Sequence, residues 1–126
     1  LLMVQLDGGL TITPWHPIID VDRSSWVFPV TMGEPEMTEC PAVYTYVTAN
    51  RKPVIVNDYI FSTFGHGLKG EVIEHEFFGT GKVINDLMNL PGYDDGIVFL
   101  SPSMFKRGYD GNVCNIVQGV EYFASL

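Results

Sequence analysis

The sequence is poor in positive charge. Lys and Arg number 7 against 15 Asp and Glu in 126 residues, which gives a net charge of -8 with neutral histidine. Proteins that bind a nucleic-acid duplex use clustered cations to displace counterions, and this sequence contains no basic run. Its apolar runs are also short, whereas a membrane-spanning helix needs about 20 apolar residues. We therefore expect neither a nucleic-acid partner nor a membrane span.

Cysteine is equally scarce. The only two, Cys40 and Cys114, are too few for the disulfide framework of a small secreted domain. The sequence has no Asn-x-Ser/Thr glycosylation site, and no charged segment followed by an apolar one opens it as in a signal peptide. These absences favour an intracellular protein.

What the chain has in abundance is apolar and turn-forming residues. Hydrophobic residues make up 46% and aromatic residues 13%, a composition that folds, and the length fits a single domain over residues 1–126. Glycine (13) and proline (8) divide the chain into short segments rich in β-branched and aromatic residues. The predicted strands are residues 1–6, 10–13, 26–30, 43–48, 54–56, 59–64, 97–100 and 112–117. Up to residue 64, their order and short turns indicate a β-meander.

One short helix is predicted near residues 82–90. Its apolar residues, among them Val83, Ile84 and Leu87, fall at helical spacing. Thr80 can cap the start, and the Pro-Gly pair after Leu90 ends it. The sequence therefore predicts an all-β fold of short antiparallel strands with one short helix.

Three features suggest chemistry but have simpler explanations. Residues 65–70 match the G-x-G-x-x-G pattern of dinucleotide sites, yet the helix and βαβ unit that this site needs are missing, so a glycine-rich turn explains them better. His16, His66 and His75 could supply a zinc site, but they lack the close spacing of known motifs. The two cysteines have no neighbouring cation to form a thiolate, which favours inert thiols. We expect no metal and no cofactor.

Thr13 and His16 form a more specific pattern. A threonine three residues before a histidine, at the end of a strand, places a hydroxyl and an imidazole near one point. Pro14 and Pro17 fix the backbone around the histidine and disfavour a helix. Because histidine is the best acid or base near neutral pH, this pair is our candidate catalytic site.

The order of several segments resembles the Hint (hedgehog/intein) superfamily, and most closely its Vint type. The segments that carry the resemblance are GGLTITPWHPI (8–18), WVFP (26–29), CPAVYTYV (40–47), VIVN (54–57), TFGHG (63–67) and HEFFGT (75–80) continuing to residue 87. The likeness spans nearly the whole chain. It implies a horseshoe-like all-β fold, with a Hint-like core over residues 1–70 and a helix-containing extension over residues 71–126.

In that family a Cys or Ser at the first residue of the domain attacks the preceding carbonyl, in an N-to-S or N-to-O acyl shift. The resemblance gives Thr13 and His16 the positions that bind and protonate the scissile amide nitrogen. Thr45, His66 and His75 are possible accessory residues. Thr45 stands where inteins often have Asp, and residues 50–52 stand where a His is often found.

The resemblance also predicts that the segment with the nucleophile precedes this chain, in a longer polypeptide that we call the parent. The partner is then an upstream module of the same polypeptide, and the 126-residue chain alone is expected to be inert. The His-Asn pair for C-terminal cleavage has no counterpart, since Gly67 follows His66, so splicing is not expected. The alternative is a degenerate Hint-like domain that serves as a non-enzymatic interaction module.

Overall fold

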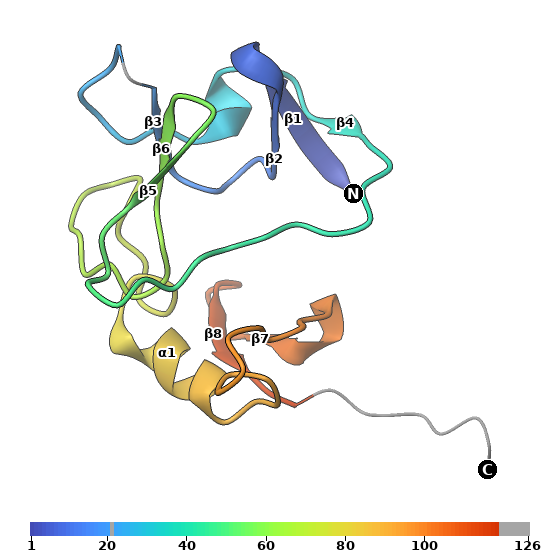
Figure 1. Ribbon diagram of the computed structural model, residues 1–126, viewed down its shortest axis with the longest axis vertical. Helices are drawn as coiled ribbons and strands as arrows, with labels where there is room; N and C mark the ends of the chain where they lie inside the picture. Colours follow the sequence, from blue (N-terminus) through green and yellow to red (C-terminus); the bar gives the residue numbers. More distant parts are fainter. Residues whose placement is uncertain (21, 119–126) are drawn as a thin grey trace.

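The computed structural model describes residues 1–20 and 22–118 (Figure 1). Its first half, drawn from blue to green, contains two small antiparallel sheets. The first sheet has the order β2-β1-β4 and the second has the order β3-β6-β5. The strands of these sheets are β1 (Leu2–Leu6), β2 (Leu10–Ile12), β3 (Ile18–Asp20), β4 (Glu36–Met37), β5 (Val54–Val56) and β6 (Tyr59–Phe61).

Two tight turns connect the paired neighbours. Between β1 and β2, Gly8 and Gly9 both have a φ of +81°, a left-handed conformation that glycine adopts without steric cost. Between β5 and β6, Asn57 and Asp58 both have positive φ angles of 50° and 67°, which fits the two-residue hairpin turns that match strand twist. These turns set the pairing of Leu6 with Leu10 and of Val56 with Tyr59.

The second half contains one α-helix and a two-stranded sheet. The helix α1 (Gly81–Met88) is capped by Thr80, whose side chain accepts a hydrogen bond from the Lys82 amide, as its position in the sequence predicts. The strands β7 (Phe105–Arg107) and β8 (Val113–Ile116) pair antiparallel. A carboxylate oxygen of Asp86 on α1 accepts the Ile116 amide at 2.8 Å and the Asn115 side chain at 2.7 Å, which ties β8 to the helix.

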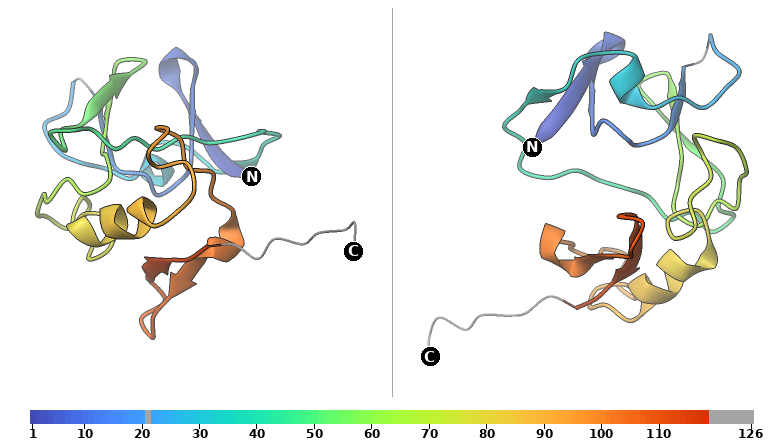
Figure 2. Two further views of the ribbon diagram at one scale, coloured as in Figure 1. Left: turned by 60° about the horizontal axis from the view of Figure 1, so that its bottom comes forward. Right: turned by 180° about the vertical axis from the view of Figure 1, so that it is seen from behind.

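Each half has its own apolar core. The core of the first half consists of Val4, Leu10, Ile12, Ile18, Tyr59 and Phe61. The core of the second half consists of Phe77, Val83, Ile84, Leu87, Leu90, Met104, Val113 and Ile116. The halves occupy opposite ends of the molecule in Figure 1 and in the view from behind in Figure 2. The described part of the chain has no helix with the length and hydropathy of a membrane span.

The structure confirms the predicted all-β class with one short helix, but several predicted elements are wrong. Residues 26–30 form no strand, because only Val27 bridges to Ile18 and Pro29 begins a 3-10 turn (Pro29–Thr31). Residues 43–48 form no ladder despite their β-prone composition, and residues 97–100 form none either. The meander is also wrong, because β1 pairs with β4 and β6 pairs with β3, across long connections.

The sequence also missed three strands. β3, β4 and β7 are only two or three residues long, which is too short for a recognisable alternation of apolar and polar residues. The last part of the predicted extension, residues 119–126, lies outside the described residues, as does Val21.

Candidate functional site

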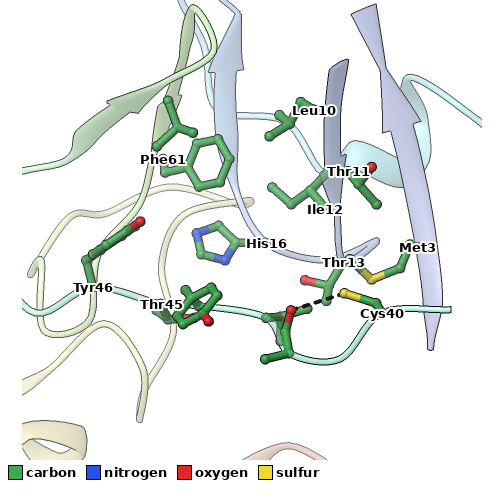
Figure 3. Close-up of a pocket in the computed structure, with 14 residues that line it drawn as sticks. Met3, Leu10, Thr11, Ile12, Thr13, His16, Cys40, Thr45, Tyr46 and Phe61 are labelled. Atoms are coloured by element: carbon green, nitrogen blue, oxygen red, sulfur yellow. Dashed lines mark hydrogen bonds between the residues drawn. The ribbon is translucent and has the colours of Figure 1, made fainter. Parts of the chain in front are cut away.

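A hollow of about 190 Å³ opens in the first half of the molecule (Figure 3). Its walls come from β1, β2, the loop after β2, β5, β6 and the segment 40–46. Met3, Thr13, His16, Cys40, Thr45 and Phe61 are among its lining residues. The structure thus brings three of the five predicted site residues, Thr13, His16 and Thr45, to a single cavity.

Backbone hydrogen bonds on both sides hold the loop that carries His16. The carbonyl oxygen of Pro14 accepts the Val30 amide at 3.0 Å, and that of Pro17 accepts the Ser62 amide at 3.2 Å. The two prolines contribute fixed φ angles, and their carbonyl groups anchor the loop to two different segments. The loop is therefore held at both ends, and the imidazole between them has little freedom.

His16 has a defined tautomer. Its Nε2 lies 2.9 Å from the backbone carbonyl oxygen of Ser62. A carbonyl oxygen only accepts hydrogen bonds, so Nε2 carries the proton and Nδ1 is left with its lone pair in the neutral ring. Nδ1 has no hydrogen-bond partner among the described residues. The ring also packs against Phe61, with ring centroids 5.3 Å apart.

Burial lowers the pKa of His16 below the ordinary value for histidine, and the hydrogen bond to Ser62 opposes this only in part. The imidazole is therefore neutral at pH 7, with its unprotonated nitrogen available to accept a proton. Once protonated, the same ring is a stronger acid than an ordinary imidazolium. These are the properties of a group that takes up a proton and then gives it away.

The other polar groups of the hollow are hydroxyls and one thiol. Within the described residues, neither the Thr13 nor the Thr45 hydroxyl has a hydrogen-bond partner, so both are free to bind a ligand. The Cys40 thiol instead donates to the carbonyl oxygen of Ala42, with Sγ 3.1 Å from the oxygen.

His66 and His75 lie elsewhere, in the second half of the molecule. Nδ1 of His66 accepts the Leu68 amide, and Nδ1 of His75 accepts the amides of Phe77 and Phe78 at 3.1 Å and 2.9 Å. Both rings thus hold local turns together. Neither of them lines the hollow that contains His16.

His75 borders a second hollow of about 330 Å³ that carries the carboxylates of Glu71, Glu74, Glu76 and Asp110. Among residues 1–20 and 22–118, no group of three or more His, Cys, Asp or Glu side chains is placed to hold a metal ion. The glycine-rich segment 65–70 is followed by turns, and the next helix is α1. A dinucleotide site at this segment would lack the helix N-terminus that binds the pyrophosphate.

Sequence reasoning missed two partners of His16. The carbonyl oxygen of Ser62, 46 residues away, sets its tautomer, and Phe61 packs against its ring. No local pattern marks a backbone carbonyl as the partner of a distant side chain. The pairing of β3 with β6 brings them together, and β3 was not predicted.

The Vint family model, whose description is Hint-domain, matches residues 1–115. The chain belongs to this Hint-domain family. The match confirms the resemblance that the sequence motifs indicated, and the small antiparallel sheets with one short helix fit a Hint-like all-β fold. No curated protein matches the chain.

Proposed function

We propose that this Hint domain acts in self-processing of a longer polypeptide and cleaves the peptide bond at its N-terminal side. The nucleophile is a Cys or Ser in the part of the parent that precedes Leu1, and the upstream module is the group that is released. One observation carries the proposal: an imidazole held by the Ser62 carbonyl, with a pKa that burial lowers, shares a hollow with two threonine hydroxyls that have no hydrogen-bond partner among the described residues.

A single proton carrier is sufficient for both proton transfers of this reaction. The sulfur or oxygen of the nucleophile loses its proton and attacks the preceding carbonyl carbon. The new C–S or C–O bond forms while the C–N bond breaks, and the nitrogen leaves as an amine after it gains a proton. An imidazole that accepts the first proton can supply the second. Water or another nucleophile then cleaves the thioester or ester and releases the upstream module.

His16 is the proposed proton carrier, and Nδ1 is the atom that carries the proton. Because Nε2–H is already bound to the Ser62 carbonyl, proton uptake occurs at the other ring nitrogen. The Ser62 carbonyl then stabilises the imidazolium and keeps its orientation while Nδ1–H is delivered to the leaving nitrogen. The lowered pKa of His16 favours that second transfer.

The two threonines orient the scissile peptide in this proposal. Thr13 follows β2 directly, and its hydroxyl is free to bind the amide whose nitrogen leaves. Thr45 lines the same hollow and is proposed as an accessory donor to the carbonyl oxygen. His66 and His75 have no part in the reaction, because their Nδ1 atoms accept backbone amides in the other half.

Release of the upstream module from the parent tests the proposal. Purified parent is incubated with and without dithiothreitol, and release is followed on a denaturing gel and by mass spectrometry. With a cysteine nucleophile, the thiol accelerates release and the module carries a thiol adduct. A parent with Cys or Ser at the start of the domain that releases nothing under either condition contradicts the proposal.

Thr13→Ala provides a graded version of this test. Loss of one hydrogen bond of about 1.4 kcal/mol in the transition state slows release about tenfold. Thr31→Ala is the matched control, because that hydroxyl donates to the Phe28 carbonyl in a 3-10 turn away from the hollow. Release by Thr13→Ala at the rate of the control contradicts the role given to Thr13.

A non-enzymatic interaction module is the second candidate. It is favoured by the exposed apolar side chains of residues 43–47, a segment without a strand partner, in which Tyr44 is 77% exposed. A folded parent that releases no module, with or without thiol, would favour this alternative.

A further inference from the structure

The Ser62 carbonyl that holds His16 lies just beyond the pairing of β3 with β6. In that antiparallel pair, Ile18 faces Phe61. The next position of the same register places Pro17 opposite Ser62, and the Ser62 amide donates to the Pro17 carbonyl oxygen at 3.2 Å. Residues that pair in this way normally exchange two hydrogen bonds. The second bond would run from the amide of residue 17 to the Ser62 carbonyl oxygen.

Pro17 cannot form this second bond. Its ring nitrogen carries no hydrogen, and its Cδ atom occupies the place where the hydrogen would be. Nε2 of His16, the preceding residue, lies 2.9 Å from the same carbonyl oxygen of Ser62. The imidazole N–H thus takes the acceptor that a backbone amide would otherwise use.

The neighbouring backbone groups offer this oxygen no other amide. Ile18 exchanges hydrogen bonds of 3.0 and 2.9 Å with Val27, so its amide is directed away from β6. On the other side of β6, the register in which Val54 faces Phe61 continues to Pro53 opposite Ser62, and Pro53 also lacks an amide hydrogen. Residue 17 is therefore the position from which a backbone amide would compete with His16.

We propose that Pro17 is a positioning residue for His16, because the absence of its amide hydrogen leaves the Ser62 carbonyl oxygen to the imidazole. Any other residue at this position would extend the ladder between β3 and β6. Its amide would share the oxygen with Nε2–H and weaken the bond that orients the ring. The effect on release of the upstream module rests on the proposed function, whereas the effect on the imidazole does not.

The pKa of His16 reports on this hydrogen bond. The bond to Ser62 raises that pKa while burial lowers it, so a weaker bond lowers it further. No Asp, Glu, Lys or Arg is among the described residues that line the hollow, where the other titratable groups are Cys40, Tyr44 and Tyr46. A change in the pKa of His16 can therefore be traced to the bond or to burial.

The first experiment titrates His16 by NMR in the 126-residue chain and in Pro17→Ala and Pro17→Val. Both substitutions introduce an amide hydrogen, and valine also restores most of the volume of the proline ring. The acid dissociation constant of His16 should rise at least about threefold in both variants, which is a fall of about half a pKa unit. Pro53→Ala is the matched control, because Pro53 is half-buried like Pro17 but its position faces the non-bonded side of Ser62. It should change the constant less than about 1.5-fold.

An unchanged or raised pKa in Pro17→Ala would overturn the proposal. A native pKa in Pro17→Val alone would do so as well, because it would assign the effect to packing of the ring. Hydrogen exchange provides a second measurement in the same variants. The new amide at position 17 should exchange at least about tenfold more slowly than in an unstructured peptide, since it joins the ladder. Unprotected exchange at position 17 would contradict the extended ladder.

Release from the parent connects this result to the chemistry. Pro17→Ala should release the upstream module at least about threefold more slowly than the parent, with near-UV circular dichroism as the check of folding, while Pro53→Ala should release it at about the rate of the parent. Folded Pro17→Ala that releases the module at the rate of an active parent would overturn the role of Pro17 in positioning. A parent that releases nothing contradicts the proposed function instead, and the two NMR measurements still decide whether Pro17 reserves the Ser62 carbonyl for His16.

Discussion

The two halves of the molecule use histidine in different ways. In the first half, His16 donates through Nε2 to the Ser62 carbonyl, and its Nδ1, beside a hollow, has no partner in the part of the chain that the structure describes. In the second half, Nδ1 of His66 and of His75 accepts backbone amides, so that these rings support turns. The pKa is lowered in all three, first of all by burial. The hydrogen bonds, rather than the direction of the pKa shifts, separate a group suited to proton transfer from structural ones.

The cores of the halves also differ in how they are secured. The first half depends on paired short strands, whereas in the second half Asp86 joins α1 to β8 through two hydrogen bonds. A single side chain thus carries a long-range connection there. This contrast makes the second half the more vulnerable to one polar substitution.

Asp86→Ala is expected to have the largest effect on folding. It leaves the Ile116 amide and the Asn115 side chain without their acceptor, which costs about 2 kcal/mol of the free energy of unfolding. Urea unfolding measures this loss. Asn85→Ala, on the exposed side of the same helix, is the control and should change stability by less than about 0.5 kcal/mol. Equal effects of the two substitutions would contradict the tie between α1 and β8.

The three histidines give a smaller effect that depends on pH. A pKa lowered in the folded state means that the unfolded chain binds protons more readily. The contribution of the histidines to the free energy of unfolding is therefore complete above the pKa of the unfolded chain, about 6.5. It decreases as the pH falls below that value toward the lower pKa values of the folded state.

Melting temperatures measured between about pH 7.5 and 5.5 test this sign, in a range where most carboxyl groups stay ionised. The melting temperature should fall with pH, and His16→Gln should reduce the slope, because glutamine can still donate to Ser62 but does not titrate. A melting temperature that rises as the pH falls would contradict the direction of the shifts.

The smallest expected effect is that of added metal. A structural zinc ion contributes on the order of 10 kcal/mol to folding, but the described residues offer no group of three suitable side chains. Stoichiometric zinc or a chelator should leave the melting temperature unchanged. Zinc that copurifies with the protein, and whose removal unfolds it, would contradict this prediction.

The sequence predicted the elements whose signals are local. Thr80 and the apolar residues at helical spacing marked α1, and the Asp7-Gly8-Gly9 turn marked the first hairpin. The sequence did not predict the elements whose formation depends on pairing with a distant segment. Residues 43–48 have strong β propensity but no partner strand, whereas β3 and β4 are strands because β6 and β1 lie beside them.

The same limit applies to the site. The spacing of Thr13 and His16 and the flanking prolines are local features, and the structure places both residues at one hollow. The Ser62 carbonyl that selects the tautomer of His16 is distant in sequence and carries no signal in its residue type. The resemblance made His66 and His75 possible accessory residues, but neither of them lines this hollow.

The central claim is that His16, and not the histidines of the second half, carries the proton during self-processing. Its most direct test compares the rates at which parent, His16→Ala and His75→Gln release the upstream module, with near-UV circular dichroism as the check of folding. His16→Ala should fold and release the module about 10²- to 10⁴-fold more slowly, the contribution of a general acid or base, while His75→Gln should release it at about the rate of the parent. Release by folded His16→Ala at the rate of the parent would contradict the claim.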